Sequence, residues 1–216
     1  MYRLSYTISS SAMGAHAALE EIGAPYVLDH VDLDVPRSAE YLRLNPQGKV
    51  PVLIDESDPA APQVIYQSAA ILLHLADKHP DAALAPVPGS AARGLCYQWL
   101  FFMAEVLQPA YMLHFYPERF TAQPDQTAGV EAKATALIGN AWAILDDAHD
   151  PGPYLLGEAF SVCDLYMHTM ALWNQPHHRP LREFANVARA LALVHARPAV
   201  QRMLAVHNPD VAVKWE

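Results

Sequence analysis

The sequence predicts a small mixed α/β domain followed by an all-α domain, and three observations lead to this fold class. Over the first 80 residues, strand-like and helix-like segments alternate, which is typical of α/β folds. Beyond residue 90, every strong hydrophobic pattern is helical. A stretch rich in proline and small residues, DAALAPVPGS (81–90), separates the two parts and suits a linker. We therefore expect domains at residues 1–80 and 91–216.

The first domain is expected to have the element order β-α-β-α-β-β-α. Gly23 predicts the end of the first helix, and Ser38 marks the start of the second. A parallel crossover followed by a hairpin gives a small mixed sheet. The expected segments are YRLSY (2–6), AMGAHAALEEIG (12–23), PYVLDHVDLD (25–34), RSAEYLRLN (37–45), VPVLID (50–55), QVIY (63–66) and QSAAILLHLADKHP (67–80).

The second domain is expected to consist of helices alone. Pro109 predicts a bend in the first of them. Ser161 and Asp164 have the spacing of a capping box, in which each side chain bonds the other residue's backbone N–H group. The expected helical segments are 91–120, 125–149, 161–173, 181–196 and 198–207.

Composition excludes several classes of function. The net charge of −9 argues against a nucleic-acid or anionic-membrane surface, since both demand clustered Lys and Arg. No apolar run has the length of a membrane span, and the N-terminal segment lacks the pattern of a signal peptide. The two cysteines, Cys96 and Cys163, have no paired spacing, so we expect a reducing, cytoplasmic environment. Neighbouring His177 and His178 lack accompanying ligands, so no metal site is expected.

Pro51 stands at the beginning of an otherwise strand-like segment. Proline has no backbone N–H group, so it fits the first position of a strand better than its interior. A cis Val50–Pro51 bond would turn the Val50 backbone outward, where an extended ligand could pair with it. The alternative is a trans proline that only ends the loop.

Three segments, NPQGKVPVL (45–53), QSAAI (67–71) and SVCD (161–164), in this order of elements resemble the cytosolic glutathione S-transferase family. The resemblance covers essentially the whole chain. It implies a thioredoxin-like first domain, a cis-proline, a homodimer, and glutathione bound as co-substrate along the proline loop. The glutathione-binding positions that it implies are Val50 and Pro51, Gln67 and Ser68 for the γ-glutamyl end, and Lys49 in the same loop.

Ser68 has a physical reason to bind an anion, independent of the resemblance. It lies at a helix N-terminus, where free N–H groups and the helix dipole favour a carboxylate. It could also act only as the helix N-cap, which is the common use of serine there, and the two roles are compatible.

The thiol chemistry is expected between the first strand and the first helix. A hydroxyl that donates a hydrogen bond to sulfur stabilises the thiolate, which is the nucleophile. Aligning His16 with the histidine of the beta-type bacterial members places Ser11 where those enzymes carry a cysteine. Ser10 is the second candidate, and Tyr6 falls on another polar position near the site. The serine run could also serve only to cap the helix.

Two departures from the beta-type pattern limit the mechanism. No cysteine occurs in residues 1–95, which excludes a cysteine mixed disulfide in the first domain. Leu107 stands where the beta-type members carry a histidine. The expected activity is transfer of glutathione to small hydrophobic electrophiles, a detoxification reaction. Disulfide reduction or isomerisation on the same site, or binding without catalysis, remains an alternative.

The electrophile is expected to contact the second domain. Tyr111, His114 and Phe115 combine apolar bulk with hydroxyl and imidazole groups, which suits a pocket for a small apolar molecule. Tyr111 and His114 share a helix face because they lie three residues apart. The alternative is that these aromatic side chains pack as core.

Overall fold

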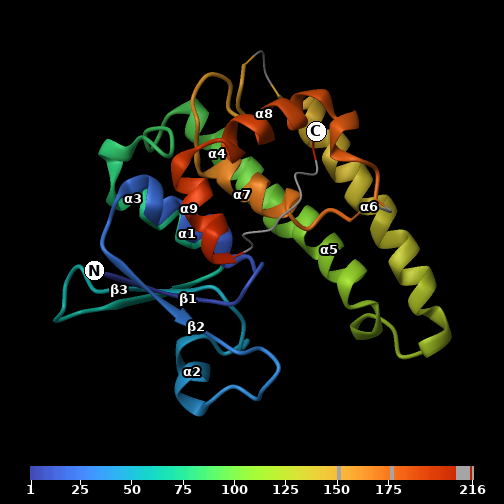
Figure 1. Cartoon of the computed structure of the whole chain (residues 1–216), viewed down its shortest axis with the longest axis horizontal. Coiled ribbons are helices and arrows are strands. Elements are labelled where there is room, and N and C mark those ends of the chain that lie inside the picture. The colour runs from blue at the N-terminus through green and yellow to red at the C-terminus, as the bar shows by residue number, and fades with distance from the viewer. Residues whose placement is uncertain (150–151, 176–177, 208–214, 216) are drawn as a thin grey trace. The chain divides into compact units, whose positions relative to one another are not determined.

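The computed structural model describes residues 1–149, 152–175, 178–207 and 215 (Figure 1). The chain forms two compact units, Met1–Ala85 together with helix α9 (Pro198–His207), and Pro86–Val194. The sequence placed every residue after 90 in the second domain, whereas α9 groups with the first unit. No helix among the described residues is long and apolar enough to cross a membrane.

The first unit is built on a four-stranded mixed sheet with the strand order β2-β1-β3-β4. Strand β1 is parallel to β2 and antiparallel to β3, and β3 is antiparallel to β4. Leu4 and Leu53 are directly paired in the two central strands, and both are fully buried. The strands are β1 (Tyr2–Tyr6), β2 (Tyr26–His30), β3 (Val52–Asp55) and β4 (Gln63–Tyr66).

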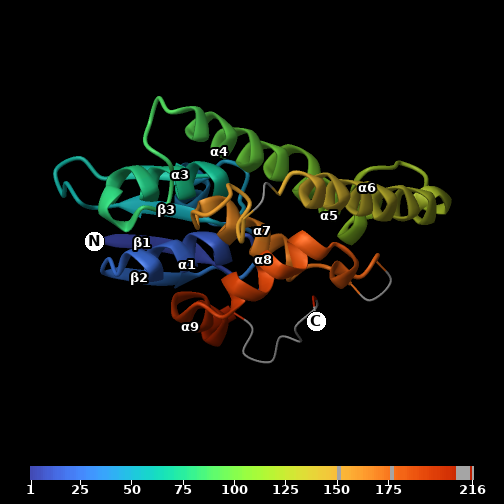
Figure 2. The ribbon, with the colours of Figure 1, turned by 90° about the horizontal axis from the view of Figure 1, so that it is seen from above.

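Helices α1 (Ala12–Ile22) and α3 (Ser68–Lys78) lie side by side on one face of this sheet (Figures 1 and 2). Helix α2 (Ala39–Leu44) lies on its other side (Figure 1). Gly23 ends α1 with a left-handed φ of 69°, and its N–H group bonds the Leu19 carbonyl, as the sequence predicts. Ser38 caps α2 by accepting a hydrogen bond from the Tyr41 N–H group. A one-turn 3₁₀ helix, Pro80–Ala82, follows α3.

The regular elements in the described part of the second unit are helices, and two isolated β-bridges, Tyr154–Gly157 and Leu156–Ala159, occur between α6 and α7. Helix α7 lies at its centre, because all ten of its residues are buried. The expected capping box is present: Ser161 accepts from the Cys163 N–H group, and Asp164 accepts from the Ser161 N–H group at 2.8 Å. The helices are α4 (Ala91–Phe102), α5 (Gln108–Phe115), α6 (Thr127–Asp147), α7 (Val162–Ala171) and α8 (Ala185–His195), with 3₁₀ turns at Pro117–Arg119, Pro124–Gln126 and Leu181–Glu183.

The irregularity in the first long helical segment differs from the expected one. A π-helical turn, Met103–Leu107, joins α4 to α5, so the change in backbone pattern precedes Pro109. Pro109 is the second residue of α5, and the backbone at Leu107 and Gln108 is right-handed helical, so the helical segment continues from the π-helical turn into α5. Because proline cannot donate to the preceding turn, a local change in the helical hydrogen bonding before it is expected.

Candidate functional site

The loop that leads to Pro51 is shaped by Asn45, a buried residue. Its Oδ1 accepts from the Gln47 N–H group at 3.1 Å, and its Nδ2 donates to the Lys49 carbonyl at 2.8 Å. The Tyr41 hydroxyl donates to the same carbonyl at 3.0 Å. Gly48 has a φ of 66°, and a Cβ there would come within 2.9 Å of the Arg37 side chain. The loop is therefore a rigid turn with a specified exit direction.

Pro51 follows this turn and precedes β3, which begins at Val52. The Val50–Pro51 peptide bond is cis, which confirms the expectation from the sequence. Pro51 is buried and Val50 half-buried, whereas Lys49 is exposed. Val50 thus lies at the mouth of a central strand, outside the strand ladder itself.

The serine run at the start of α1 distributes its three hydroxyl groups to different partners. Ser9 donates to the His207 carbonyl at 3.5 Å, and Ser10 donates to the Thr7 carbonyl at 2.7 Å. The Ser10 hydroxyl also accepts from the Ala12 N–H group, so Ser10 provides the local cap of α1. Ser11, by contrast, donates to the Val50 carbonyl at 3.3 Å and is nearly fully buried.

Ser68 belongs to the same hydrogen-bonded cluster, although its expected role as N-cap is wrong. The N-cap position of α3 is occupied by Gln67, and Ser68 is the first helical residue. Its hydroxyl donates to the Ser11 carbonyl at 3.1 Å. Gln67 is exposed and has a φ of 80°, a strained conformation for a residue with a side chain.

Ser11, Val50 and Ser68, three residues far apart in the sequence, therefore meet at one place. We call these three residues the serine cluster. The cluster brings together the N-termini of two helices, α1 and α3, neither of which has an acidic residue in its first turn. Free N–H groups and helix dipoles at such ends stabilise anions, and here they adjoin an extended backbone segment. The arrangement can bind a peptide-like molecule and stabilise a negative charge on it.

Tyr6, the third residue expected at the thiol site, lies at the end of β1. Its ring packs edge-to-face against His30 at 5.4 Å and against His207 at 5.1 Å between ring centroids. The structure thus gives Tyr6 an aromatic environment beside the loop that carries the serines.

The residues expected to contact an electrophile differ in their exposure. Tyr111 is fully buried; its hydroxyl donates to Asn174 Oδ1 at 3.2 Å and accepts from Trp142 Nε1 at 3.0 Å. Burial raises the pKa of Tyr111 well above its ordinary value. Tyr111 is therefore a core residue, which corrects the expected substrate-binding role. His114 is buried beside Glu131, and Phe115 is partly exposed.

Among the described residues, no group of three or more His, Cys, Asp or Glu side chains could hold a metal ion. Of the two neighbouring histidines, His178 is described, whereas His177 lies outside the described residues.

The sequence-based reasoning missed Asn45 and His207. An asparagine that precedes Pro-x-Gly could have indicated the turn before Pro51, but nothing in the neighbouring sequence marks His207.

Comparison with known proteins agrees with this geometry. Residues 8–78 match the family model described as the glutathione S-transferase N-terminal domain. The glutathione S-transferase GstA of Escherichia coli O157:H7 is 25% identical over 209 residues, covering 95% of this chain and 98% of that protein. A sphingomonad glutathione S-transferase, solved in complex with glutathione, is 28% identical with a TM-score of 0.82, covering 95% and 98% of the two chains. A beta-class glutathione S-transferase of Sphingomonas chungbukensis is 27% identical with a TM-score of 0.81, over the same shares.

Proposed function

Because residues 8–78 match the glutathione S-transferase N-terminal domain and the chain is similar to glutathione S-transferases over nearly its whole length, we propose that it is a glutathione transferase whose serine cluster binds glutathione and activates its thiol. The observation that carries the proposal is the hydrogen bond from the Ser11 hydroxyl to the Val50 carbonyl at 3.3 Å. It places a proton donor beside the backbone segment along which the tripeptide would extend.

Glutathione would be held mainly by backbone groups. The Val50 backbone would pair with the cysteinyl residue as a neighbouring strand would, since Val50 lies just outside the β3 ladder. The γ-glutamyl carboxylate would bind at the N-terminus of α3, where the Ser68 N–H group would donate to it and the Ser68 hydroxyl would turn to it from the Ser11 carbonyl. Gln67 is exposed beside this helix end, and its side-chain oxygen would accept from the ammonium group. Lys49 is exposed in the same loop and would meet the glycyl carboxylate.

Ser11 would act on the thiol. When glutathione is bound, the Ser11 hydroxyl turns from the Val50 carbonyl to the sulfur atom and stabilises the thiolate over the thiol. The thiol proton passes to solvent. The sulfur then donates an electron pair to an electrophilic carbon, a C–S bond forms, and the leaving group departs with the electrons of its own bond. Ser10 is less suited to this role because its hydroxyl is used by Thr7 and Ala12.

Phe115 and His114 are the proposed contacts for the electrophile. Phe115 is partly exposed and stacks on Tyr111 at 6.0 Å between ring centroids, so the buried tyrosine fixes its orientation. An apolar ring beside an imidazole suits a small aromatic electrophile.

We also propose that the protein is a homodimer, for which sedimentation at micromolar concentration is the test. A species of 23.8 kDa alone would contradict it.

Two measurements on the purified protein test the proposed function. Calorimetry should detect glutathione binding, and conjugation of glutathione to an aromatic halide should proceed faster than in buffer. If the protein turns over a small disulfide but not the halide, its activity is disulfide reduction and the proposed transferase activity is wrong. Absence of glutathione binding would contradict both activities.

A further inference from the structure

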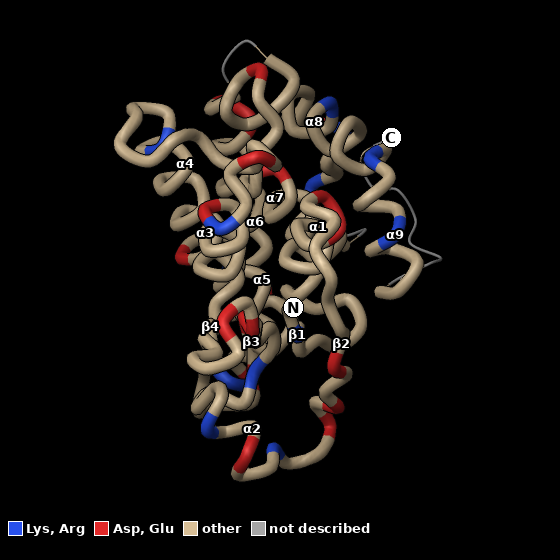
Figure 3. Tube along the Cα trace, turned by 90° about the vertical axis from the view of Figure 1, so that its left-hand side faces the viewer, with Lys and Arg blue, Asp and Glu red and all other residues tan. Residues whose placement is uncertain are grey.

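Ion pairs join helix α9 and the residue before it, near the C-terminal end of the chain, to α1. Arg197 forms two parallel hydrogen bonds with the Glu21 carboxylate, at 2.6 and 2.8 Å. Arg197 directly precedes α9, and Arg202, within α9, pairs with Glu20 and also donates to its backbone carbonyl at 3.3 Å. Figure 3 shows the acidic end of α1 beside basic residues at and before α9. Bidentate pairs of this kind fix geometry as well as adding energy.

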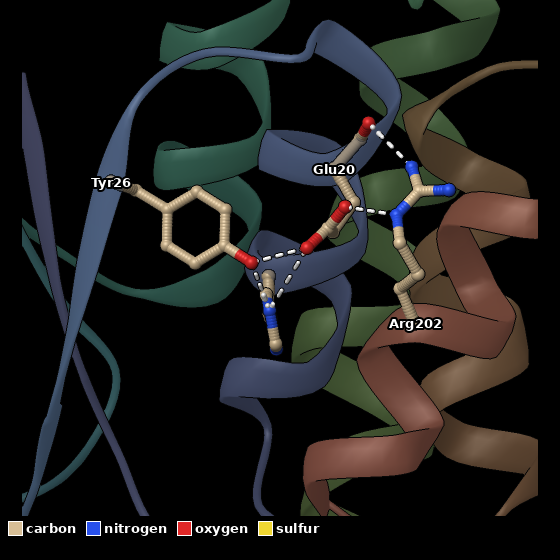
Figure 4. A network of polar contacts seen from close by, with 4 residues as sticks. Glu20, Tyr26 and Arg202 are labelled. Atoms are coloured by element: carbon tan, nitrogen blue, oxygen red, sulfur yellow. Dashed lines mark hydrogen bonds and ion pairs between the residues drawn. The ribbon is translucent and has the colours of Figure 1, made fainter.

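Glu20 is itself held in place from the other side. The Tyr26 hydroxyl, from β2, donates to the Glu20 carboxylate and bonds His16 Nε2 at 2.8 Å (Figure 4). Burial alone would raise the pKa of the Glu20 carboxyl, but the hydrogen bonds from Tyr26 and Arg202 hold it below its ordinary value. The carboxylate is therefore charged and oriented, and it locates α9 relative to α1 and the sheet.

The far end of α9 reaches the loop that carries the serines. The ring of His207 is fully buried, 5.1 Å from the ring of Tyr6 and 5.3 Å from that of His16. The His207 carbonyl accepts the hydrogen bond from the Ser9 hydroxyl. The Thr7 backbone also lies beside the His207 ring, although neither ring nitrogen has a hydrogen bond of ordinary geometry among the described residues.

The loop between β1 and α1 is short, and its backbone conformation is held by several hydrogen bonds. Ser9 adopts a φ of 55°, which is uncommon for a residue with a side chain and must be supported by its surroundings. Ser11 follows only two residues later. A change in the backbone at Ser9 would therefore alter the direction of the Ser11 hydroxyl.

We propose that α9 is a positioning element of the thiol site, and that His207 holds Tyr6 through its ring and the Ser9 hydroxyl through its backbone carbonyl, so that Ser11 is directed at the sulfur of glutathione. This inference rests on the proposed function. If His207 has only a structural role, replacing it lowers the stability of the protein and leaves the pKa of the bound thiol unchanged. A positioning role changes the thiol pKa in the folded protein.

The test compares His207→Ala and His207→Phe with the control Val206→Ala. Val206 lies next to His207 on α9 but is 37% exposed. The readout is the thiolate absorbance of bound glutathione as a function of pH. His207→Ala should raise the pKa of the bound thiol by about half a unit or more, and lower kcat near neutral pH about threefold or more, in proportion to the thiolate fraction. His207→Phe restores the buried ring and should return both values close to those of the wild type, and Val206→Ala should leave both unchanged.

An unchanged thiol pKa in folded His207→Ala would overturn the inference, even if its denaturation midpoint fell. Hydrogen exchange of residues 7–12 without glutathione gives an independent answer. Faster exchange in His207→Ala than in His207→Phe is expected, and equal exchange would count against the inference. If the wild type itself binds no thiolate, the proposed function fails, and the exchange experiment alone decides whether α9 positions this loop.

Discussion

The Ser68 hydroxyl donates a hydrogen bond to the Ser11 carbonyl at 3.1 Å, and this bond joins the N-terminus of α3 to that of α1. The two serines are 57 residues apart in the sequence, and each lies at the point where a helix begins. With Val50 they form a cluster that has two helix dipoles directed at it and little charge of its own. Such a cluster suits a ligand that carries both a carboxylate and an ionisable thiol.

Replacing Ser68 by alanine should weaken glutathione binding. The substitution removes a hydroxyl donor to the γ-glutamyl carboxylate, and a charge-assisted hydrogen bond left unmade costs about 1 to 3 kcal/mol. Calorimetry should record a dissociation constant higher by roughly 5- to 150-fold. Ser68→Thr retains the hydroxyl and serves as the control. An unchanged dissociation constant in Ser68→Ala would restrict the Ser68 hydroxyl to its bond with Ser11.

The two cysteines should be unreactive in the native protein. Cys96 and Cys163 are fully buried, with their Sγ atoms 3.6 Å apart. The hydrogen bond to Cys96, together with burial, raises the pKa of the Cys163 thiol well above its ordinary value. Because the thiolate is the reactive form, a chromogenic disulfide should label neither thiol in the native state and both in denaturant. Since neither cysteine belongs to the serine cluster, an alkylating agent should leave activity intact; rapid loss of activity would contradict a mechanism based on serine.

Stability should depend on pH through His16 and His207. The pKa of each imidazole is lowered to about 4, for His16 by burial, and for His207 by burial together with the neighbouring His16. The unfolded chain, with histidine pKa values near 6.5, binds protons at higher pH than the folded protein does. The stabilisation is therefore complete above pH 6.5 and is lost as the pH falls towards 4, by up to about 3 kcal/mol per histidine. Glu20, Tyr26 and Tyr6 are the other titratable groups that face this pair.

Urea denaturation of the wild type and of His207→Phe between pH 6.5 and 4 separates this contribution from others. Asp164 acts in the opposite sense, because burial raises its pKa to about 6, but it is common to both proteins. The free energy of unfolding of His207→Phe should fall less steeply than that of the wild type. Parallel curves would show that His207 titrates as it does in the unfolded chain.

Local features of the fold could be predicted from the sequence because they depend on neighbouring residues. Ser38 and Gly23 mark helix ends through hydrogen bonds made within one turn, and the Ser161–Asp164 box does the same. The π-helical turn at Met103–Leu107 was not predicted, since Pro109 offered a simpler reason for a bend. The sequence does not show whether a long helical segment accommodates a proline by a bend or by a π-helical turn.

The parts of the candidate site that depend on neighbouring residues could be predicted from the sequence. The parts that depend on contacts between residues far apart in the sequence could not. Pro51 and its turn are specified locally, by Asn45 and Gly48. Ser11 faces Val50 only because the fold brings residues 39 positions apart together, and the neighbouring Ser9 hydroxyl bonds the His207 carbonyl, nearly 200 residues away in the sequence. No periodicity or spacing in the sequence contains that information.

The Ser11 hydroxyl is proposed to lower the pKa of the thiol of bound glutathione. A hydrogen bond donated to sulfur is stronger for the thiolate than for the thiol, and each unit of pKa corresponds to about 1.4 kcal/mol of that difference. Ser11→Ala should raise the pKa of the bound thiol by roughly one to two units and lower turnover near neutral pH about ten- to a hundredfold. Binding of S-alkylated glutathione, which has no ionisable thiol, should change little.

The most direct measurement is the thiolate absorbance of bound glutathione against pH in the wild type, Ser11→Ala and Ser10→Ala. We expect Ser11→Ala to move the titration of the thiol to higher pH. We expect Ser10→Ala to leave the titration in place, because the Ser10 hydroxyl is bonded to Thr7 and Ala12. A titration moved by Ser10→Ala and not by Ser11→Ala, or moved by neither, would contradict the role assigned to Ser11.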